Sequence, residues 1–139
     1  MIILDTNVIT ELQKPQPNQG VLDWLDAQEP TNLYLTSITA AELTHGVCLL
    51  PEGARARQLT EAVQHILEVE FKGRILPFEA IAAERYGMIM AEMKRSGISM
   101  GICDAQIAAI SVAHYCSPIA TRNVKPFKAV QLKVVNPFT

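Results

Sequence analysis

Short apolar segments alternate with longer segments of helical character along this 139-residue chain. The first, Met1–Leu4, is an uninterrupted apolar run, which is typical of a strand buried on both faces of a sheet. Further strands are predicted at Asn32–Thr36, Arg74–Pro77, Pro118–Thr121 and Leu132–Val135. Because helical segments separate most of these strands, the pattern predicts an α/β domain around a mostly parallel sheet of about four to five short strands.

The predicted helices are delimited by apolar spacing and by residues that end helices. Pro15 and Pro17 end the first helix, Pro51 ends the third, and Gly97 follows the fifth, at a position that favours glycine. The helices are predicted at Asn7–Gln13, from Asn18 or Gln19 to Pro30, and at Thr39–Leu50, Glu52–Phe71, Glu79–Arg95 and Asp104–Tyr115. No repeat and no dividing linker is evident, so residues 1–139 are predicted to form one domain.

The amino-acid composition limits which classes of protein this chain can belong to. Hydrophobic residues make up 49% of the sequence, enough for a packed core. Lys and Arg number 12 against 14 acidic residues, for a net charge of −2, so nucleic-acid binding would need a local basic patch. No apolar run approaches the roughly 20 residues that cross a bilayer, and no signal-peptide pattern is evident. The odd number of cysteines, 3, is typical of reduced thiols, and we expect a cytoplasmic protein without membrane contact.

Three acidic residues, far apart in the sequence, each lie near a predicted helix start. Asp5 follows the first strand directly, Glu42 lies six residues after the second, and Asp104 opens the last predicted helix. The turns that follow the strands of an open parallel sheet meet at one edge, where ligands bind. Three carboxylates meeting there would repel one another, and Mg²⁺ or Mn²⁺ would offset that repulsion. The pattern predicts a metal-dependent nuclease.

Each acid also has a purely structural interpretation. Asp5 can accept hydrogen bonds from the free N–H groups of the following helix, and the helix dipole favours Asp104. Thr39 and Glu42 have the spacing of a capping box, in which Thr39 begins the helix. Capping and metal binding are compatible roles, so both interpretations stay open.

Two other kinds of site fit the sequence less well. Asp5-Thr6-Asn7 is similar to the start of an aspartate-nucleophile phosphatase, but Asn7 stands where a second aspartate is expected. His45 and Cys48 lack a second ligand pair with zinc spacing, which favours core packing. Neither alternative displaces the three-carboxylate hypothesis.

A small basic group follows the fourth predicted strand. It consists of Arg122, Lys125 and Lys128. Phosphate contacts hold a nucleic acid without reading its sequence, so these residues are candidates for binding an RNA backbone. Ordinary solvent-exposed loop charge is the alternative.

Four motifs occur in order along the chain: Ile3–Ile9 (ILDTNVI), Thr39–Leu43 (TAAEL), Asp104–Ala109 (DAQIAA) and Ala120–Asn123 (ATRN). Together they resemble the PIN-domain ribonucleases. The similarity extends from Met1 to the terminal VNPF and is closest to the VapC/FitB branch, the toxins of type II toxin–antitoxin modules, also called plasmid stability proteins.

This resemblance implies a PIN-like three-layer sandwich and a Mg²⁺- or Mn²⁺-dependent endoribonuclease. On matching positions, Asp5, Glu42 and Asp104 are the implied metal ligands and catalytic residues. Thr6, Thr121 and Asn123 are the implied supporting polar groups. The resemblance also implies an RNA substrate, a homodimer and inhibition by a small DNA-binding antitoxin.

The sequence departs from the family pattern in one place. Relatives usually carry a fourth acid at the position of Asn123 or of Pro126, whereas Thr121–Phe127 (TRNVKPF) contains none. Three carboxylates suffice for one ion, because Mg²⁺ keeps several waters and uses few protein ligands. A second ion would need further protein ligands, which the missing acid does not supply. The missing acid also favours an alternative function, a catalytically degenerate PIN domain that binds an antitoxin or a partner chain.

Overall fold

Five short strands form one sheet in the order β3-β2-β1-β4-β5 in the computed structural model, which describes residues 1–139. Every neighbouring pair is parallel, and Ile3 lies between Tyr34 and Ile119. The chain passes from β1 outward to β3 and then crosses to β4 and β5, so the direction switches between β1 and β4. The strands are β1 (Ile2–Leu4), β2 (Leu33–Thr36), β3 (Ile75–Leu76), β4 (Ile119–Ala120) and β5 (Val134–Val135).

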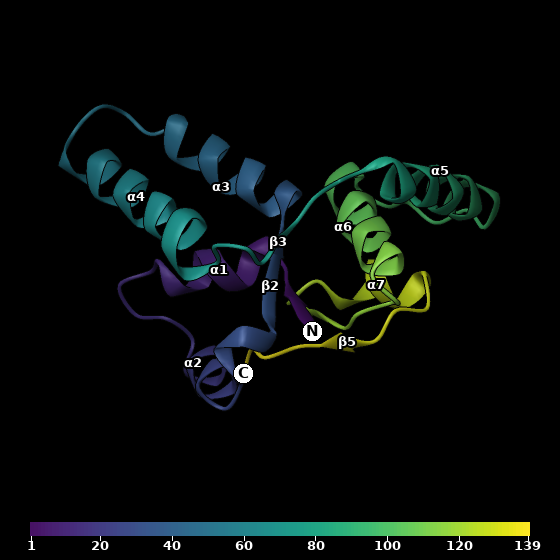
Figure 1. The fold of residues 1–139 in the computed structure, drawn as a ribbon, viewed down its shortest axis with the longest axis horizontal. Helices are drawn as coiled ribbons and strands as arrows, with labels where there is room; N and C mark the ends of the chain where they lie inside the picture. The colour runs from purple at the N-terminus through teal and green to yellow at the C-terminus, as the bar shows by residue number, and fades with distance from the viewer.

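Helices lie on both sides of the strands (Figure 1). One side carries α1 (Thr6–Leu12), α2 (Gln19–Asp26), α3 (Ser37–Cys48) and α4 (Ala54–His65), which continues into a π-helical segment, η2 (Ile66–Glu70). The other side carries α5 (Ala80–Arg95), α6 (Ile102–Ala113) and α7 (Val124–Ala129), and a short 3₁₀ segment, η1 (Pro30–Asn32), precedes β2. None of these helices is both long and apolar enough to cross a membrane.

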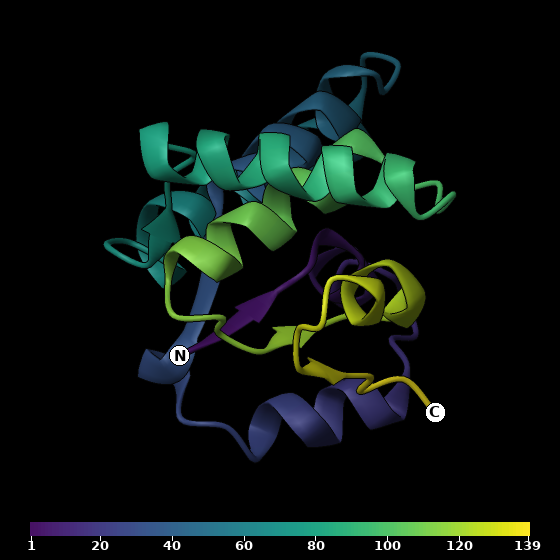
Figure 2. The same cartoon turned by 90° about the vertical axis from the view of Figure 1, so that its right-hand side faces the viewer.

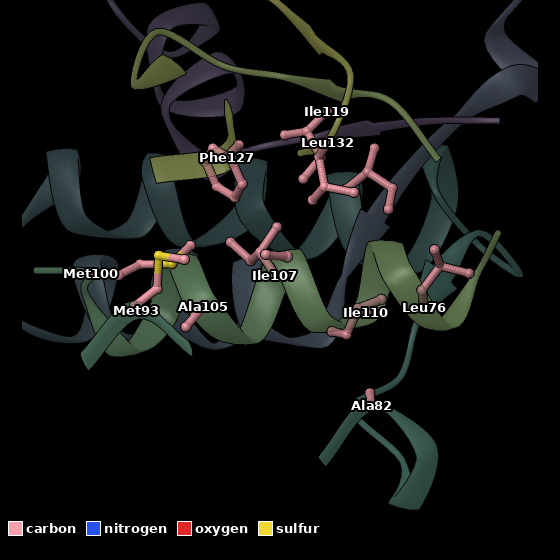
Figure 3. Close-up of a cluster of buried hydrophobic side chains, with 12 residues drawn as sticks. Leu76, Ala82, Met93, Met100, Ala105, Ile107, Ile110, Ile119, Phe127 and Leu132 are labelled. Atoms are coloured by element: carbon pink, nitrogen blue, oxygen red, sulfur yellow. The ribbon is translucent and has the colours of Figure 1, made fainter. Parts of the chain in front are cut away.

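Successive side chains of the strands pack alternately into two separate hydrophobic cores. Ile3 and Ile119 pack in the core shared with α5, α6 and α7, whereas Leu4 and Ala120 pack in the core beneath α1 to α4. In the first core, Ile107 of α6 points toward Phe127 of α7, and both are fully buried (Figure 3). Each such side chain contributes roughly 1.5–3 kcal/mol by leaving water. Two apolar faces explain why the strands are uninterrupted apolar runs, and they confirm the predicted α/β fold with its parallel sheet.

Most predicted elements are present within a few residues, and three predictions need correction. His45 and Cys48 are exposed on α3, so the core packing predicted for them is wrong. Thr39 does not begin a helix: α3 begins at Ser37, and the Thr36 hydroxyl caps it by accepting from the Thr39 N–H at 3.2 Å. The prediction of a capping box formed by Thr39 and Glu42 is therefore wrong. The segment after β4, for which no helix was predicted, forms α7 despite Pro126, because a first-turn proline gives up no helical hydrogen bond.

Candidate active site

A polar pocket of about 270 Å³ opens beside the β1–β4 switch. Its carboxylates come from three elements: Asp5 follows β1, Glu42 lies in α3, and Asp104 lies in the first turn of α6. No hydrophobic residue lines it; the lining residues are Asp5, Thr6, Asn7, Thr10, Glu42, Asp104 and Asn123. The sequence prediction that these three acids meet at one edge of the sheet is consistent with this pocket.

Asp5 is the most enclosed of the three carboxylates. It caps α1, with Oδ1 accepting from the Thr6 N–H at 2.8 Å. Oδ2 accepts from the Thr121 hydroxyl at 2.8 Å and from Asn7 Nδ2 at 3.3 Å. The pKa of Asp5 is raised from 3.8 to about 6, mainly by burial and further by the charges of Asp104 and Glu42, while the hydrogen bonds from Thr121 and Thr6 lower it. Asp5 therefore caps α1 and also lines the acidic pocket.

Glu42 is held through a chain of hydroxyl groups. It lies in the second turn of α3, and its Oε1 accepts from the Thr6 hydroxyl at 2.7 Å. The Thr6 hydroxyl is also 2.9 Å from that of Thr39, which is fully buried. A carboxylate only accepts, so the single hydroxyl hydrogen of Thr6 points at Glu42 and Thr39 donates to Thr6. Thr39 therefore supports Glu42 from within the core, which replaces the capping role predicted for it.

Asp104 lies two residues inside α6, which begins at Ile102 after the Gly101 cap. Its Oδ2 accepts from Asn123 Nδ2 at 3.2 Å. Burial and the neighbouring charge of Glu42 raise the pKa of Asp104, while the Asn123 hydrogen bond lowers it. Burial and the same three acids raise the pKa of the adjacent Cys103 thiol. The field in this pocket is strongly negative.

The donor chemistry of the pocket fits a hard divalent cation. Burial and the neighbouring carboxylates raise the pKa of Asp5 and Asp104, and a cation would relieve both the desolvation of Asp5 and the repulsion between the acids. As the side chains stand, no three of the His, Cys, Asp and Glu residues are close enough to hold a metal ion directly. Separate neutral donors hold each acid: Thr121 for Asp5, Thr6 for Glu42 and Asn123 for Asp104.

The predicted basic residues lie outside the pocket lining. The Arg122 guanidinium is 3.1 Å from Glu11 Oε1 and lies over the Phe138 ring, 4.1 Å from its centroid. Lys125 and Lys128 are exposed on α7 and form no ion pair. Arg122 is therefore engaged within the protein, and the two lysines are free to meet a ligand.

Sequence reasoning missed four polar residues around the pocket. Asn7 bridges Asp5, Thr121 and the Arg122 backbone, and Thr10 lines the pocket one helical turn further on. Their spacing of three residues, which puts them on one helix face, was the available signal. Thr39 and Glu11 were missed because both are polar side chains on buried helix faces, and Glu11 shares its face with Val8.

Comparison with known proteins places this arrangement in a family. The model of the PIN domain matches residues 2–132. The plasmid stability protein StbB of Pseudomonas syringae pv. tomato is 43% identical over 99% of both chains. The VapC ribonuclease Y4jK of Sinorhizobium fredii is also 43% identical, over 99% of this chain and 98% of its own. The solved structure of FitAcB from Neisseria gonorrhoeae has a TM-score of 0.92 and 41% identity, covering 99% of this chain and 98% of that one. The chain belongs to the PIN-domain family.

Proposed function

We propose that this protein is a divalent-metal-dependent endoribonuclease and the toxin half of a type II toxin–antitoxin pair. The observation that carries the proposal is the pocket lined by Asp5, Glu42 and Asp104 with no hydrophobic residue, at the sheet edge where parallel folds bind ligands. Full-length relatives named as a ribonuclease and as Toxin FitB support it.

Asp5, Asp104 and Glu42 would hold Mg²⁺ or Mn²⁺. Such an ion, when bound, lowers the pKa of a water and neutralises charge on a phosphate. Asp5 is kept in one orientation by donors to both of its oxygens, and Thr121 and Asn7 supply two of these. Glu42 uses Oε1 for the Thr6 hydroxyl, which leaves Oε2 to accept a proton or to orient a water at the phosphate. Such hydrolysis would leave a 5′-phosphate and a 3′-hydroxyl.

The RNA backbone would run past α7. Lys125 and Lys128 are exposed and unpaired in this helix, and it follows directly from Asn123 at the pocket. Arg122 adds positive charge at the same place, with its side chain 56% exposed. Because phosphate contacts carry no base information, these residues would position RNA and would not select its sequence.

The proposed partners are an antitoxin and a second copy of the chain. Solved relatives include FitAB bound to a DNA fragment, 40% identical with a TM-score of 0.93, and VapBC2 of Rickettsia felis bound to a promoter fragment. For this chain, a DNA-binding antitoxin and a homodimer are the corresponding proposals. The site of action would be the cytoplasm, where RNA is accessible.

The test is to map new RNA 5′ ends after brief expression of the chain without antitoxin, beside Asp5→Asn. Sharp ends produced only by the unmodified chain are expected, and they would also identify the target. Identical maps from two folded, soluble proteins would contradict the nuclease.

A binding module without catalysis is the second candidate, favoured by the absence of any acid between Thr121 and Lys133. Mn²⁺ titration of the purified protein separates the two functions. Stabilisation by Mn²⁺ supports the nuclease. A lack of stabilisation, together with retained antitoxin binding, supports the module.

A further inference from the structure

The end of the chain, residues 137–139, packs closely against the start of α2. Asn18 Nδ2 donates to the Thr139 carbonyl at 3.0 Å, and the Thr139 N–H and hydroxyl donate back to Asn18 Oδ1, both at 3.1 Å. Gly20 lies beneath this tail, where an added Cβ would come within 2.4 Å of Thr139. Both views show the C-terminus beside α2 (Figures 1 and 2). This packing leaves no room for a side chain at position 20, so the tail is a built part of the fold.

From this position, Phe138 reaches the segment after β4. Its ring stacks against the Arg122 guanidinium, with 4.1 Å from the guanidinium carbon to the ring centroid. The same guanidinium donates to Glu11 Oε1 at 3.1 Å. The Glu11 side chain is only 5% exposed, and Lys14 and the Asn18 N–H also contact it. A buried carboxylate and an aromatic face thus hold Arg122 from two directions.

Arg122 lies between two residues that touch the acidic pocket. On one side, Thr121 donates its hydroxyl to Asp5 at 2.8 Å. On the other, Asn123 Nδ2 donates to Asp104 at 3.2 Å. The Arg122 N–H donates to Asn7 Oδ1 at 3.1 Å, which ties the backbone to α1. Arg122 is therefore joined through the backbone to donors of two carboxylates.

The two donors differ in how independently they are fixed. The backbone of Thr121 pairs with β5 through a 2.9 Å hydrogen bond to the Val135 carbonyl, and its side chain is buried. Asn123 lies beyond the strand and is exposed, so its bond to Asp104 competes with water. The Asn123 N–H donates to the Thr121 hydroxyl at 3.0 Å, so it is the side-chain contact of Asn123 with Asp104 that depends on further support.

We propose that Glu11, Arg122 and Phe138 form a positioning clamp that holds Asn123 against Asp104 and so sets the affinity of the pocket for divalent cations. This inference rests on the proposed function. It gives Arg122 a positioning role and makes Phe138, which does not line the pocket, a determinant of the site. Groups behind metal ligands typically alter metal affinity by tenfold or more.

The test uses Phe138→Leu, which keeps apolar bulk but removes the π-face, and Phe138→Trp, which restores it. Arg122→Lys is a second disruption, because it keeps a positive charge near Glu11 without a planar guanidinium. The matched control is Phe71→Leu: Phe71 carries the other cation–π contact, with Arg74 at 4.9 Å, and is not among the pocket residues.

Two quantities are measured on each protein: the Mn²⁺ dissociation constant without RNA, and the side-chain amide resonance of Asn123. Phe138→Leu and Arg122→Lys are expected to weaken Mn²⁺ binding roughly tenfold and to shift the Asn123 resonance. Phe138→Trp and Phe71→Leu should match the unmodified protein. Unchanged Mn²⁺ affinity in both disrupted variants, or equal weakening in Phe71→Leu, would overturn the clamp.

Failure of the proposed function gives a different pattern. In that case the unmodified protein neither binds Mn²⁺ nor cleaves RNA, and the Asn123 resonance alone decides about the clamp. A shift in Phe138→Leu but not in Phe71→Leu supports the clamp, and no shift in either variant contradicts it.

Discussion

The buried carboxylate of Asp5 predicts an unusual pH dependence of stability. Its pKa in the folded protein is about 6, against 3.8 for an ordinary aspartate, chiefly because burial penalises the charged form. The folded state therefore binds this proton more tightly than the unfolded state. By linkage, stability is highest where Asp5 is protonated, falls as the pH rises from about 4 to about 6, and levels off above that range.

The difference between 3.8 and about 6 corresponds to roughly 3 kcal/mol of unfolding free energy. Asp5→Asn removes this titration but adds a constant cost. An asparagine offers one oxygen and one NH₂ group, whereas both oxygens of Asp5 accept hydrogen bonds, from the Thr6 N–H and from the Thr121 hydroxyl. One mismatched donor costs roughly 1–3 kcal/mol at every pH. The diagnostic quantity is therefore how the difference in unfolding free energy between Asp5→Asn and the unmodified protein changes with pH, and not its value at one pH.

Urea unfolding in EDTA, from pH 4 to pH 8, measures this change for the unmodified protein and Asp5→Asn. The unfolding free energy of Asp5→Asn minus that of the unmodified protein should rise by roughly 2.4 kcal/mol between pH 4 and pH 7, because an unfolded aspartate is already partly ionised at pH 4. The lowered pKa values of Glu11 and Glu92, caused mainly by hydrogen bonds from Lys14 and Arg95, act in the opposite direction. Both proteins contain these residues, so their effect cancels. A difference that stays constant across this range would refute a buried, desolvated Asp5.

Three further predictions concern the cation and the frame of the site. Mn²⁺ at 100 times its dissociation constant should stabilise the unmodified protein by about 2.7 kcal/mol in thermal unfolding, and equal stabilisation of Asp5→Asn would count against Asp5 as a ligand. Asn123→Asp replaces a donor to Asp104 with a fourth negative charge, so the metal-free protein should lose roughly 1 kcal/mol at pH 7 while Mn²⁺ binds more tightly. Calorimetric titration checks both the affinity and the stoichiometry, and weaker Mn²⁺ binding would contradict this view. Arg74→Ala removes donors to the carbonyls of Pro30, Leu33 and Glu70, and should cost roughly 2 kcal/mol in urea unfolding. Its Mn²⁺ affinity should not change, because Arg74 lies outside the pocket.

The sequence predicted the sheet well because burial on both faces leaves a strong local pattern. Apolar runs such as Met1–Leu4 became strands, and Asp5 became a helix cap, since both depend on neighbouring residues only. The start of α3 was misplaced by two residues because Thr36 and Thr39 are equally good caps by composition. Only the end of β2 in three dimensions decides between them. The helix α7 was missed because a short segment with a proline and two lysines has no apolar periodicity.

The site was predicted as three acids, with Thr6, Thr121 and Asn123 as supporting groups from the family resemblance, whereas the contacts of Thr39, Asn7 and Glu11 were not predicted. Asp5, Glu42 and Asp104 could be grouped from the general rule about the edge of a parallel sheet. The hydroxyl chain from Thr39 through Thr6 to Glu42 joins residues 33 positions apart, and the contact of Arg122 with Glu11 spans 111. Such contacts depend on strand order and side-chain direction, so no local spacing in the sequence reports them.

The charge balance of the pocket accounts for the amide at position 123. Burial, and after it the neighbouring carboxylates, already raise the pKa of Asp5 and Asp104, and a fourth carboxylate beside Asp104 would add repulsion that one ion only partly offsets. An asparagine keeps a hydrogen bond to Asp104 without adding charge. The following residues are basic, with Lys125 and Lys128 on α7, so positive charge next to the pocket comes from side chains. A pocket of this kind is suited to one cation, and under the proposed function an RNA phosphate and the nearby lysines would take the place of the fourth acid that the family resemblance implies.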